Sequence, residues 1–195
     1  MDKRDRAREV SPSYEPRAGN LTYEDYLRMP AGLRYELVEG EIRMVPSPSK
    51  SHQNVAANLV TALRIWARET SHGEVYSAPL DVLLSEATVV QPDVLFISRD
   101  RLSIAEEPYV NGPPDLVVEI LSPSNSDWDR VTKRRIYSRY GVKEFWLVDI
   151  AAKSVELSQQ ENGQLVTVQT LREGSSLTSP LLPGFELKVE AVFEA

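Results

Sequence analysis

Residues 117–122 read VVEILS, and this apolar run with one acidic residue inside it decides the fold. A near-continuous apolar run is typical of a β-strand that is covered on both faces. Glu119 lies within the run, although an ionised carboxylate is costly there unless it is paired, hydrogen-bonded or bound to a metal. Because side chains alternate along a strand, Asp115, Val117, Glu119 and Leu121 should share one face.

A second acidic residue enters an apolar run farther upstream. Asp93 directly precedes Val-Leu-Phe-Ile in the segment QPDVLFIS at 91–98. We expect Asp93 and Glu119 to lie on neighbouring strands, to face each other and to share a divalent cation. The alternative is structural, with Asp93 capping the start of a strand and Glu119 paired with a buried lysine or arginine.

The helix expected at 128–140 carries a lysine that fits either interpretation. At 3.6 residues per turn, Lys133 lies on the same side as Ile136 and Tyr140, which make that side apolar enough to face the sheet. Lys133 should therefore point toward the strand that carries Glu119. It could orient a water or steady a phosphate, or it could form a plain ion pair, and the residue pattern does not separate these roles.

The remaining segments alternate between helical and extended patterns. Helices are also expected at 22–29 and at 50–69, the latter with a core stripe of Val55, Leu59, Ala62, Leu63 and Trp66. Strands are expected at 75–84, 89–97, 116–121, 144–149 and 185–189. Hairpins are expected at 34–45 around Glu39-Gly40, and from strands at 154–157 and 165–170 that flank Asn162-Gly163. Ser126 or Asp127 should cap the helix at 128–140, and Gly141 should end it.

This order predicts an α/β (α+β) fold, with a mixed central sheet flanked by helices and a hairpin near each end of the chain. Residues 1–20 are charged and show little apolar periodicity, which predicts a flexible N-terminal arm. We expect residues 21–195 to form a single domain. No apolar run approaches the roughly 20 residues of a membrane helix, and no secretory signal is evident, so we expect a cytoplasmic protein.

Composition restricts the chemistry that the chain can perform. The 195 residues include no cysteine and two histidines, and the formal net charge is −7. Disulfides, cysteine nucleophiles and multi-histidine zinc sites are therefore excluded, and a catalytic metal would rest mainly on carboxylates, which suits Mg²⁺ or Mn²⁺. The acidic balance argues against a generic nucleic-acid coat, but a local basic surface can still dock phosphates.

Five segments in order resemble a known family. They are RYELVEGEI (34–42), PSPSKSHQNV (46–55), QPDVLFIS (91–98), PDLVVEILSPSNS (114–126) and DRVTKRRIYSRYGVKEFWLVDI (129–150). Together they resemble the Uma-type restriction endonucleases, a family of the PD-(D/E)XK nuclease superfamily, over roughly residues 20–190. The resemblance implies a restriction-endonuclease-like fold in which Asp93 and Glu119 bind Mg²⁺ or Mn²⁺, helped by the backbone carbonyl of Ile120.

The chain departs from the superfamily at one motif position. Leu121 stands where the Glu-Xaa-Lys motif places its lysine. The resemblance implies that the lysine has moved to the following helix, where Lys133 fits the role.

Two further residues, Glu36 and His52, match family positions. Glu36 could supply a third acid or be an exposed hairpin acid, and His52 could contact a phosphate, orient an acid or belong to the core. Tyr137 could line the site beside Lys133 or only pack there.

The implied reaction is metal-assisted hydrolysis of a phosphodiester bond in DNA. Lys50, Arg130 and Arg134 would anchor phosphates, although each could equally be a solvated surface charge. One alternative is an inactive nuclease-fold module that binds nucleic acid or a protein partner. Another is a hydrolase of small phosphoesters or nucleotides. Exposed strand edges could also support a homodimer, as an analogy with restriction-type nucleases suggests.

Overall fold

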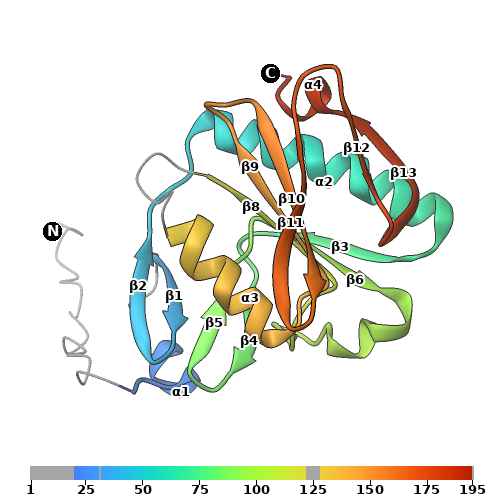
Figure 1. Cartoon of the computed structure of the whole chain (residues 1–195). Coiled ribbons are helices and arrows are strands. Elements are labelled where there is room, and N and C mark those ends of the chain that lie inside the picture. Colours follow the sequence, from blue (N-terminus) through green and yellow to red (C-terminus); the bar gives the residue numbers. More distant parts are fainter. Residues whose placement is uncertain (1–19, 31, 122–127, 195) are drawn as a thin grey trace, which may run out of the picture.

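The central element of the molecule is a mixed β-sheet (Figure 1). The computed structural model describes residues 20–30, 32–121 and 128–194. Within these ranges the central sheet has six strands in the order β11-β10-β9-β8-β6-β3. They are β3 (Gly73–Ser77), β6 (Val94–Ser98), β8 (Leu116–Ile120), β9 (Glu144–Asp149), β10 (Ser154–Glu161) and β11 (Gln164–Leu171). Strands β8 and β9 run parallel while β6 and β8 run antiparallel, so the predicted mixed sheet is confirmed.

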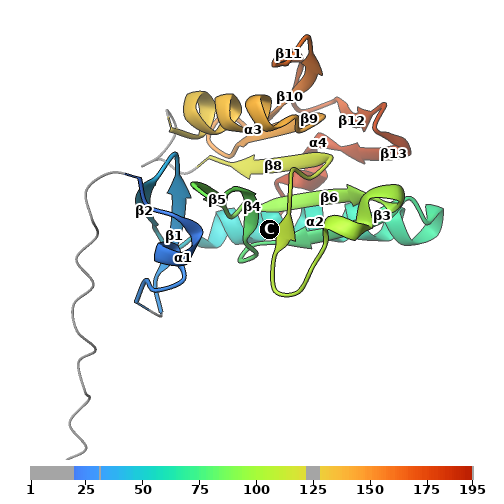
Figure 2. The same ribbon diagram turned by 90° about the horizontal axis from the view of Figure 1, so that it is seen from below.

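Helices cover the two faces of this sheet. Figure 2 shows α3 (Arg134–Tyr140) on one side of β8 and β6 and α2 (Lys50–Thr70) on the other. Alternate strand residues pack on each side: Val94 and Val118 belong to the core that contains α2, whereas Leu95 and Val117 belong to the core that contains α3. Of the predicted α2 stripe, four members are buried and Ala62 is partly buried. Glu119, two residues after Val117, therefore faces α3.

A second sheet lies beside the first and holds the N-terminal hairpin. Within the described ranges it has five short strands in the order β2-β1-β5-β4-β7. They are β1 (Arg34–Val38), β2 (Glu41–Val45), β4 (Val82–Ser85), β5 (Thr88–Val90) and β7 (Val110–Asn111). The hairpin turn at Glu39 and Gly40 has φ values of 51° and 83°, which are typical of the left-handed turns that join such strands. The predicted helix at 22–29 is shorter, as α1 (Tyr23–Tyr26), and begins at a capping box on Thr22.

Two predicted strands were wrong because each is divided between the two sheets. The run at 75–84 becomes β3 and β4, and the run at 89–97 becomes β5 and β6. Pro79 and Pro92 lie between the members of each pair. Proline has no N–H to donate to a strand ladder, so the chain leaves one sheet there and enters the other.

The C-terminal region contains more β-structure than the sequence pattern indicated. The hairpin β10–β11 is longer than predicted, and its turn at Asn162 and Gly163 has the expected positive φ values, 49° and 82°. Beyond it, β12 (Ser176–Ser179) pairs with β13 (Leu182–Lys188), and α4 (Val189–Val192) follows. The strand predicted at 185–189 is thus part of β13, whereas β12 was not predicted.

The predicted helix at 128–140 begins as a π-helical turn. This turn spans Trp128–Lys133 and continues into α3, which ends at Gly141 with φ 82°, as predicted. The predicted caps Ser126 and Asp127 lie outside the described residues, as does most of the predicted arm at 1–20. Single π-helical turns occur often at functional sites, and this one ends at Lys133.

Among the helices that the structure describes, none combines the length and the apolar character that crossing a membrane requires.

Candidate active site

The acidic residues Asp93 and Glu119 lie side by side at one end of the central sheet. Val94 pairs with Val118 in the antiparallel register of β6 and β8. Asp93, just before Val94, therefore lies opposite Glu119, just after Val118. The N–H of Ile120 donates to Oδ2 of Asp93 at 2.8 Å, which fixes this carboxylate against the end of β8.

Glu119 is buried and contacts two side chains from the helix above it. The Nζ of Lys133 lies 2.9 Å from both carboxylate oxygens of Glu119. The hydroxyl of Tyr137 donates to Oε1 of Glu119 at 2.6 Å. Lys133 and Tyr137 are themselves buried, so these contacts are shielded from water and position Glu119 firmly. The inward direction predicted for Lys133 is therefore observed.

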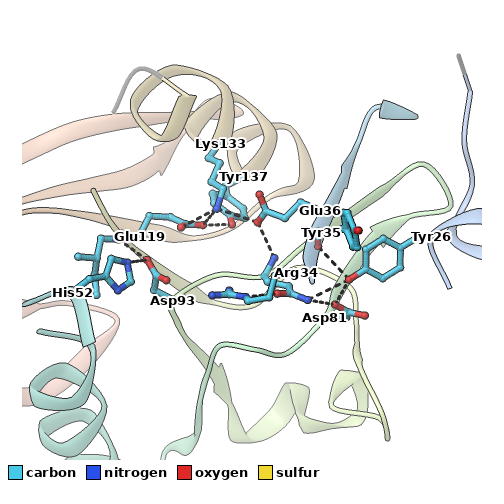
Figure 3. Close-up of polar contacts among 12 residues, drawn as sticks. Tyr26, Arg34, Tyr35, Glu36, His52, Asp81, Asp93, Glu119, Lys133 and Tyr137 are labelled. Carbon is cyan, nitrogen blue, oxygen red and sulfur yellow. Dashed lines mark hydrogen bonds and ion pairs between the residues drawn. The ribbon is translucent and has the colours of Figure 1, made fainter. Parts of the chain in front are cut away.

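Glu36 completes a buried trio of charges. Its Oε1 lies 3.0 Å from Nζ of Lys133, so one ammonium lies between the carboxylates of Glu36 and Glu119 (Figure 3). The backbone N–H of Gln91 also donates to Oε1 of Glu36, at 2.9 Å. Glu36 is 2% exposed, so the structure contradicts the alternative of an exposed hairpin acid.

His52 contacts Asp93 from the first turn of α2. Ser49 caps this helix by accepting a hydrogen bond from the backbone N–H of His52. Nε2 of His52 lies 3.2 Å from Oδ2 of Asp93. Burial lowers the pKa of His52, but the hydrogen bond and charge of Asp93 and a hydrogen bond to the Ile120 backbone outweigh it, so the net pKa is raised. The contact with Asp93 therefore favours protonation of His52 relative to a free histidine.

Asp93, Glu119, Lys133, Glu36 and His52 line one cleft of about 640 Å³ between the hairpin β1–β2 and the ends of α2 and β8. Tyr137 contacts Glu119 but is not among the lining residues. Arg34 and Arg43 on the hairpin line its wall together with Trp128. The guanidinium carbon of Arg43 lies 4.0 Å from the ring centroid of Trp128, a cation–π contact. The cleft thus combines carboxylates with cationic and aromatic groups.

A hydrogen-bond network holds Arg34, one of the two arginines that line the cleft and that are here called the arginine wall (Arg34 and Arg43). Nε of Arg34 donates to Oε1 of Gln91 at 3.1 Å, and Nε2 of Gln91 donates to Oδ1 of Asp81 at 2.8 Å. The hydroxyl of Tyr26 also donates to this oxygen, at 2.7 Å, and burial together with this bond raises the pKa of Tyr26. Sequence reasoning missed Arg34 and Gln91. A signal for both existed, because they stand close to Glu36 and Asp93 in RYELVEGEI and QPDVLFIS.

None of the three predicted phosphate anchors lines the cleft, although two of them adjoin or contact lining residues. Lys50 is exposed at the start of α2, between Ser49 and Ser51, which line the cleft. Arg130 is ion-paired at 2.6 Å with Asp149, another lining residue.

Arg134 is directed elsewhere. Its guanidinium pairs with Glu156 on β10 and donates to Thr167 on β11 at 3.0 Å. It does not line the cleft that contains Asp93 and Glu119.

The donor set at the base of the cleft suits a hard divalent cation. Oδ2 of Asp93 accepts hydrogen bonds from Nε2 of His52 and from the backbone N–H of Ile120. Within the described ranges no group donates a hydrogen bond to its Oδ1. A carboxylate offers about four acceptor positions, so the bonds from Lys133 and Tyr137 do not by themselves exclude a cation from Glu119. In the described part of the chain, however, no group of three or more His, Asp or Glu side chains is arranged to hold a metal ion. The residues fit Mg²⁺ or Mn²⁺ by chemistry, without a preformed cluster.

The mixed sheet, its flanking helices and the acidic site at one sheet end define a restriction-endonuclease-like fold. A solved structure from Anabaena variabilis ATCC 29413, described as "a putative nuclease belonging to DUF820", superimposes with a TM-score of 0.75. It is 19% identical, over 89% of this chain and 97% of that one, and the likeness supports the fold.

Residues 23–190 match the model of the Uma2 family, described as "Putative restriction endonuclease", and the chain belongs to this family. A relative from Synechocystis sp. (strain ATCC 27184 / PCC 6803 / Kazusa), "Uncharacterized protein slr1290", is 29% identical over 144 residues. The match covers 70% of this chain and 72% of that protein. The family membership supports a nuclease-like function.

Proposed function

We propose that the protein is a metal-dependent nuclease that hydrolyses phosphodiester bonds in DNA. One observation carries the proposal: Nζ of Lys133 lies 2.9 Å from both oxygens of Glu119, beside Asp93. Lys133, at the end of the π-helical turn, thus contacts Glu119. The superfamily motif instead places its lysine two residues after the glutamate, on the same strand. The glutamate and the lysine are in contact, and Asp93 directly precedes the neighbouring strand, which supports the proposal although the order of these residues in the sequence differs from that motif.

Asp93 and Glu119 would hold Mg²⁺ or Mn²⁺, together with the backbone carbonyl of Ile120. When bound, such an ion supplies Lewis-acid activation of the phosphodiester and of a water. Lys133 would position the attacking water or stabilise negative charge that develops on the phosphate. Tyr137 and His52 would act as positioning residues, because they donate to Glu119 and to Asp93, respectively.

The arginine wall would anchor the DNA backbone. Arg34 and Arg43 line the cleft on the same hairpin as Glu36, and guanidinium groups bind phosphate through paired hydrogen bonds. Lys50 and Arg130 would extend this contact at the edge of the cleft. The formal net charge of −7 makes such a local concentration of cations necessary for docking a polyanion.

A nicking assay tests the proposal. We expect the purified protein to nick supercoiled DNA with Mn²⁺ or Mg²⁺. Asp93→Asn and Glu119→Gln should each lower the rate by about a hundredfold or more, since several kcal/mol of transition-state stabilisation are lost. Glu186→Gln is the matched control, because this carboxylate is 62% exposed on β13 and should be replaceable without effect. Nicking that survives in both cleft variants would exclude this metal site.

A second candidate function is an inactive nuclease-fold module that binds nucleic acid or a protein partner. It is favoured by the ammonium of Lys133, which already compensates Glu36 and Glu119 without a metal. Calorimetric titration with Mn²⁺ separates the two functions. A nuclease should show saturable binding that Asp93→Asn abolishes, whereas the inactive module should bind its partner and show no specific Mn²⁺ site.

A further inference from the structure

Within the described ranges, most arginines that do not line the cleft form ion pairs with carboxylates. Arg28, Arg101, Arg130, Arg134, Arg135 and Arg139 all form ion pairs. By contrast, Arg64, Arg68 and Arg99 have no carboxylate partner among the residues that the structure describes, and all three line one groove. This grouping is notable in a protein with a net charge of −7.

The groove has a volume of about 490 Å³ and lies at the C-terminal end of α2. Strand β3, at the edge of the central sheet, and the short 3-10 helix η1 (Arg99–Ile104) form its other walls. Arg64 and Arg68 are one turn apart on α2 and so lie on the same side of the helix. Figure 1 shows α2 running from the hairpin β1–β2 toward the opposite end of the molecule, so the groove and the cleft are far apart.

Backbone carbonyls hold two of these guanidinium groups in place without neutralising them. Nε of Arg64 donates to the carbonyl of Val75 at 3.1 Å, and Nη1 of Arg99 donates to the carbonyl of Ser71 at 3.3 Å. Within the described ranges Arg68 makes no side-chain hydrogen bond. The remaining donors of all three side chains are thus available to a ligand, because one guanidinium carries five N–H groups.

Among the residues that line the groove, one carries a carboxylate. Glu74 lines the groove and accepts a hydrogen bond from the hydroxyl of Tyr76. Burial and this hydrogen bond raise the pKa of Tyr76 to about 12, so its phenol remains a donor at neutral pH. Three guanidinium groups therefore face a single engaged carboxylate, and the groove carries net positive charge suited to an anion.

We propose that this groove is a second anion site, which binds phosphate groups through Arg64, Arg68 and Arg99. Arginine matches phosphate by paired hydrogen bonds, and a groove that holds several guanidinium groups favours a multiply charged ligand. The helical rise places Arg68 about 24 Å from His52 along α2, which corresponds to about seven base pairs of duplex at 3.4 Å each. A nucleic acid bound at the cleft is one source of such phosphates, and this source rests on the proposed function. Free phosphate is the other.

Binding measurements without divalent metal test the site independently of cleavage. Fluorescence anisotropy would compare Arg68→Gln/Arg99→Gln with the parent on a duplex of about 30 base pairs and on a stem-loop of about six. On the long duplex, the slope of log K against log salt should fall in magnitude by about 1.8, because two phosphate contacts are lost. The stem-loop cannot contact both sites at once, so its affinity should change less than that of the long duplex.

Arg172→Gln/Lys188→Gln is the matched control, because it removes the same charge from exposed positions near the C-terminal hairpin. Arg68→Gln alone guards against misfolding, since within the described ranges this side chain makes no hydrogen bond. A slope that falls equally in the control would overturn the assignment to the groove.

Free phosphate is tested by thermal denaturation. If inorganic phosphate stabilises the parent and the control but not Arg68→Gln/Arg99→Gln, the groove is a phosphate site whichever result the duplex gives. If neither the duplex slope nor the phosphate effect depends on these arginines, the anion site does not exist. Failure of the nicking assay would leave both measurements interpretable, because neither requires cleavage.

Discussion

Replacing Lys133 by methionine removes the cation that lies between the buried carboxylates of Glu36 and Glu119. Methionine keeps most of the side-chain volume, so the main change is electrostatic. Nζ of Lys133 lies 3.0 Å from Glu36 and 2.9 Å from Glu119, and the three side chains are no more than 7% exposed. Removing one partner of such a buried ion pair typically costs about 3–5 kcal/mol, because the remaining charge is uncompensated.

Urea denaturation without metal measures this cost. We expect the free energy of unfolding of Lys133→Met to fall by about 3–5 kcal/mol relative to the parent. Adding Glu36→Gln and Glu119→Gln should recover a large part of it, since the charges that lost their partner are then neutral. A loss below about 1 kcal/mol, the level of exposed pairs, would show that Lys133 does not compensate these carboxylates.

Two further predictions concern single side chains. Tyr137→Phe removes the 2.6 Å hydrogen bond to Glu119, so it should lower the free energy of unfolding by about 1.5–3 kcal/mol in urea denaturation; an unchanged value would argue that the hydroxyl does not position Glu119. Burial raises the pKa of Glu144 above 4.5, although hydrogen bonds from Ser179, Trp146 and Gln159 oppose it. Because the folded-state pKa is raised, the stability from neutral Glu144 is complete below pH 4.5 and is lost as pH rises through the folded-state value. Glu144→Gln should therefore melt higher than the parent at pH 7, and melting curves that show the same difference at pH 4 and pH 7 would contradict this sign.

Local patterns predicted the elements that carry most of the candidate site. The apolar run around Glu119 indicated a strand buried on both faces, and the spacing of Lys133 with Ile136 indicated which side of its helix faces the sheet. Periodicities of two and 3.6 residues determine such directions from neighbouring residues alone. Both directions hold in the structure, where Lys133 and Glu119 are in contact.

The contacts of Glu36 and His52 depended on the chain path. The sequence predicted Glu36 as either a third acid of the site or an exposed hairpin residue, because neighbouring residues do not indicate which segment covers a hairpin. In the structure, Leu37 pairs with Val89, and this long-range pairing carries the hairpin to Lys133. The direction of His52 likewise depends on where α2 begins relative to the end of β8.

The division of the β-structure into two sheets could not be seen in the hydrophobic pattern. The runs at 75–84 and 89–97 each look continuous, yet each supplies a strand to both sheets. Periodicity reports which side of a segment is apolar and says nothing of its pairing partner. The sequence alone was therefore enough to predict the strand that carries Glu119 and the direction of the Lys133 side chain toward the sheet. Pairing between distant segments decided the second sheet, the cleft wall with Arg34 and the arginine groove, because such contacts exist only once the chain has folded.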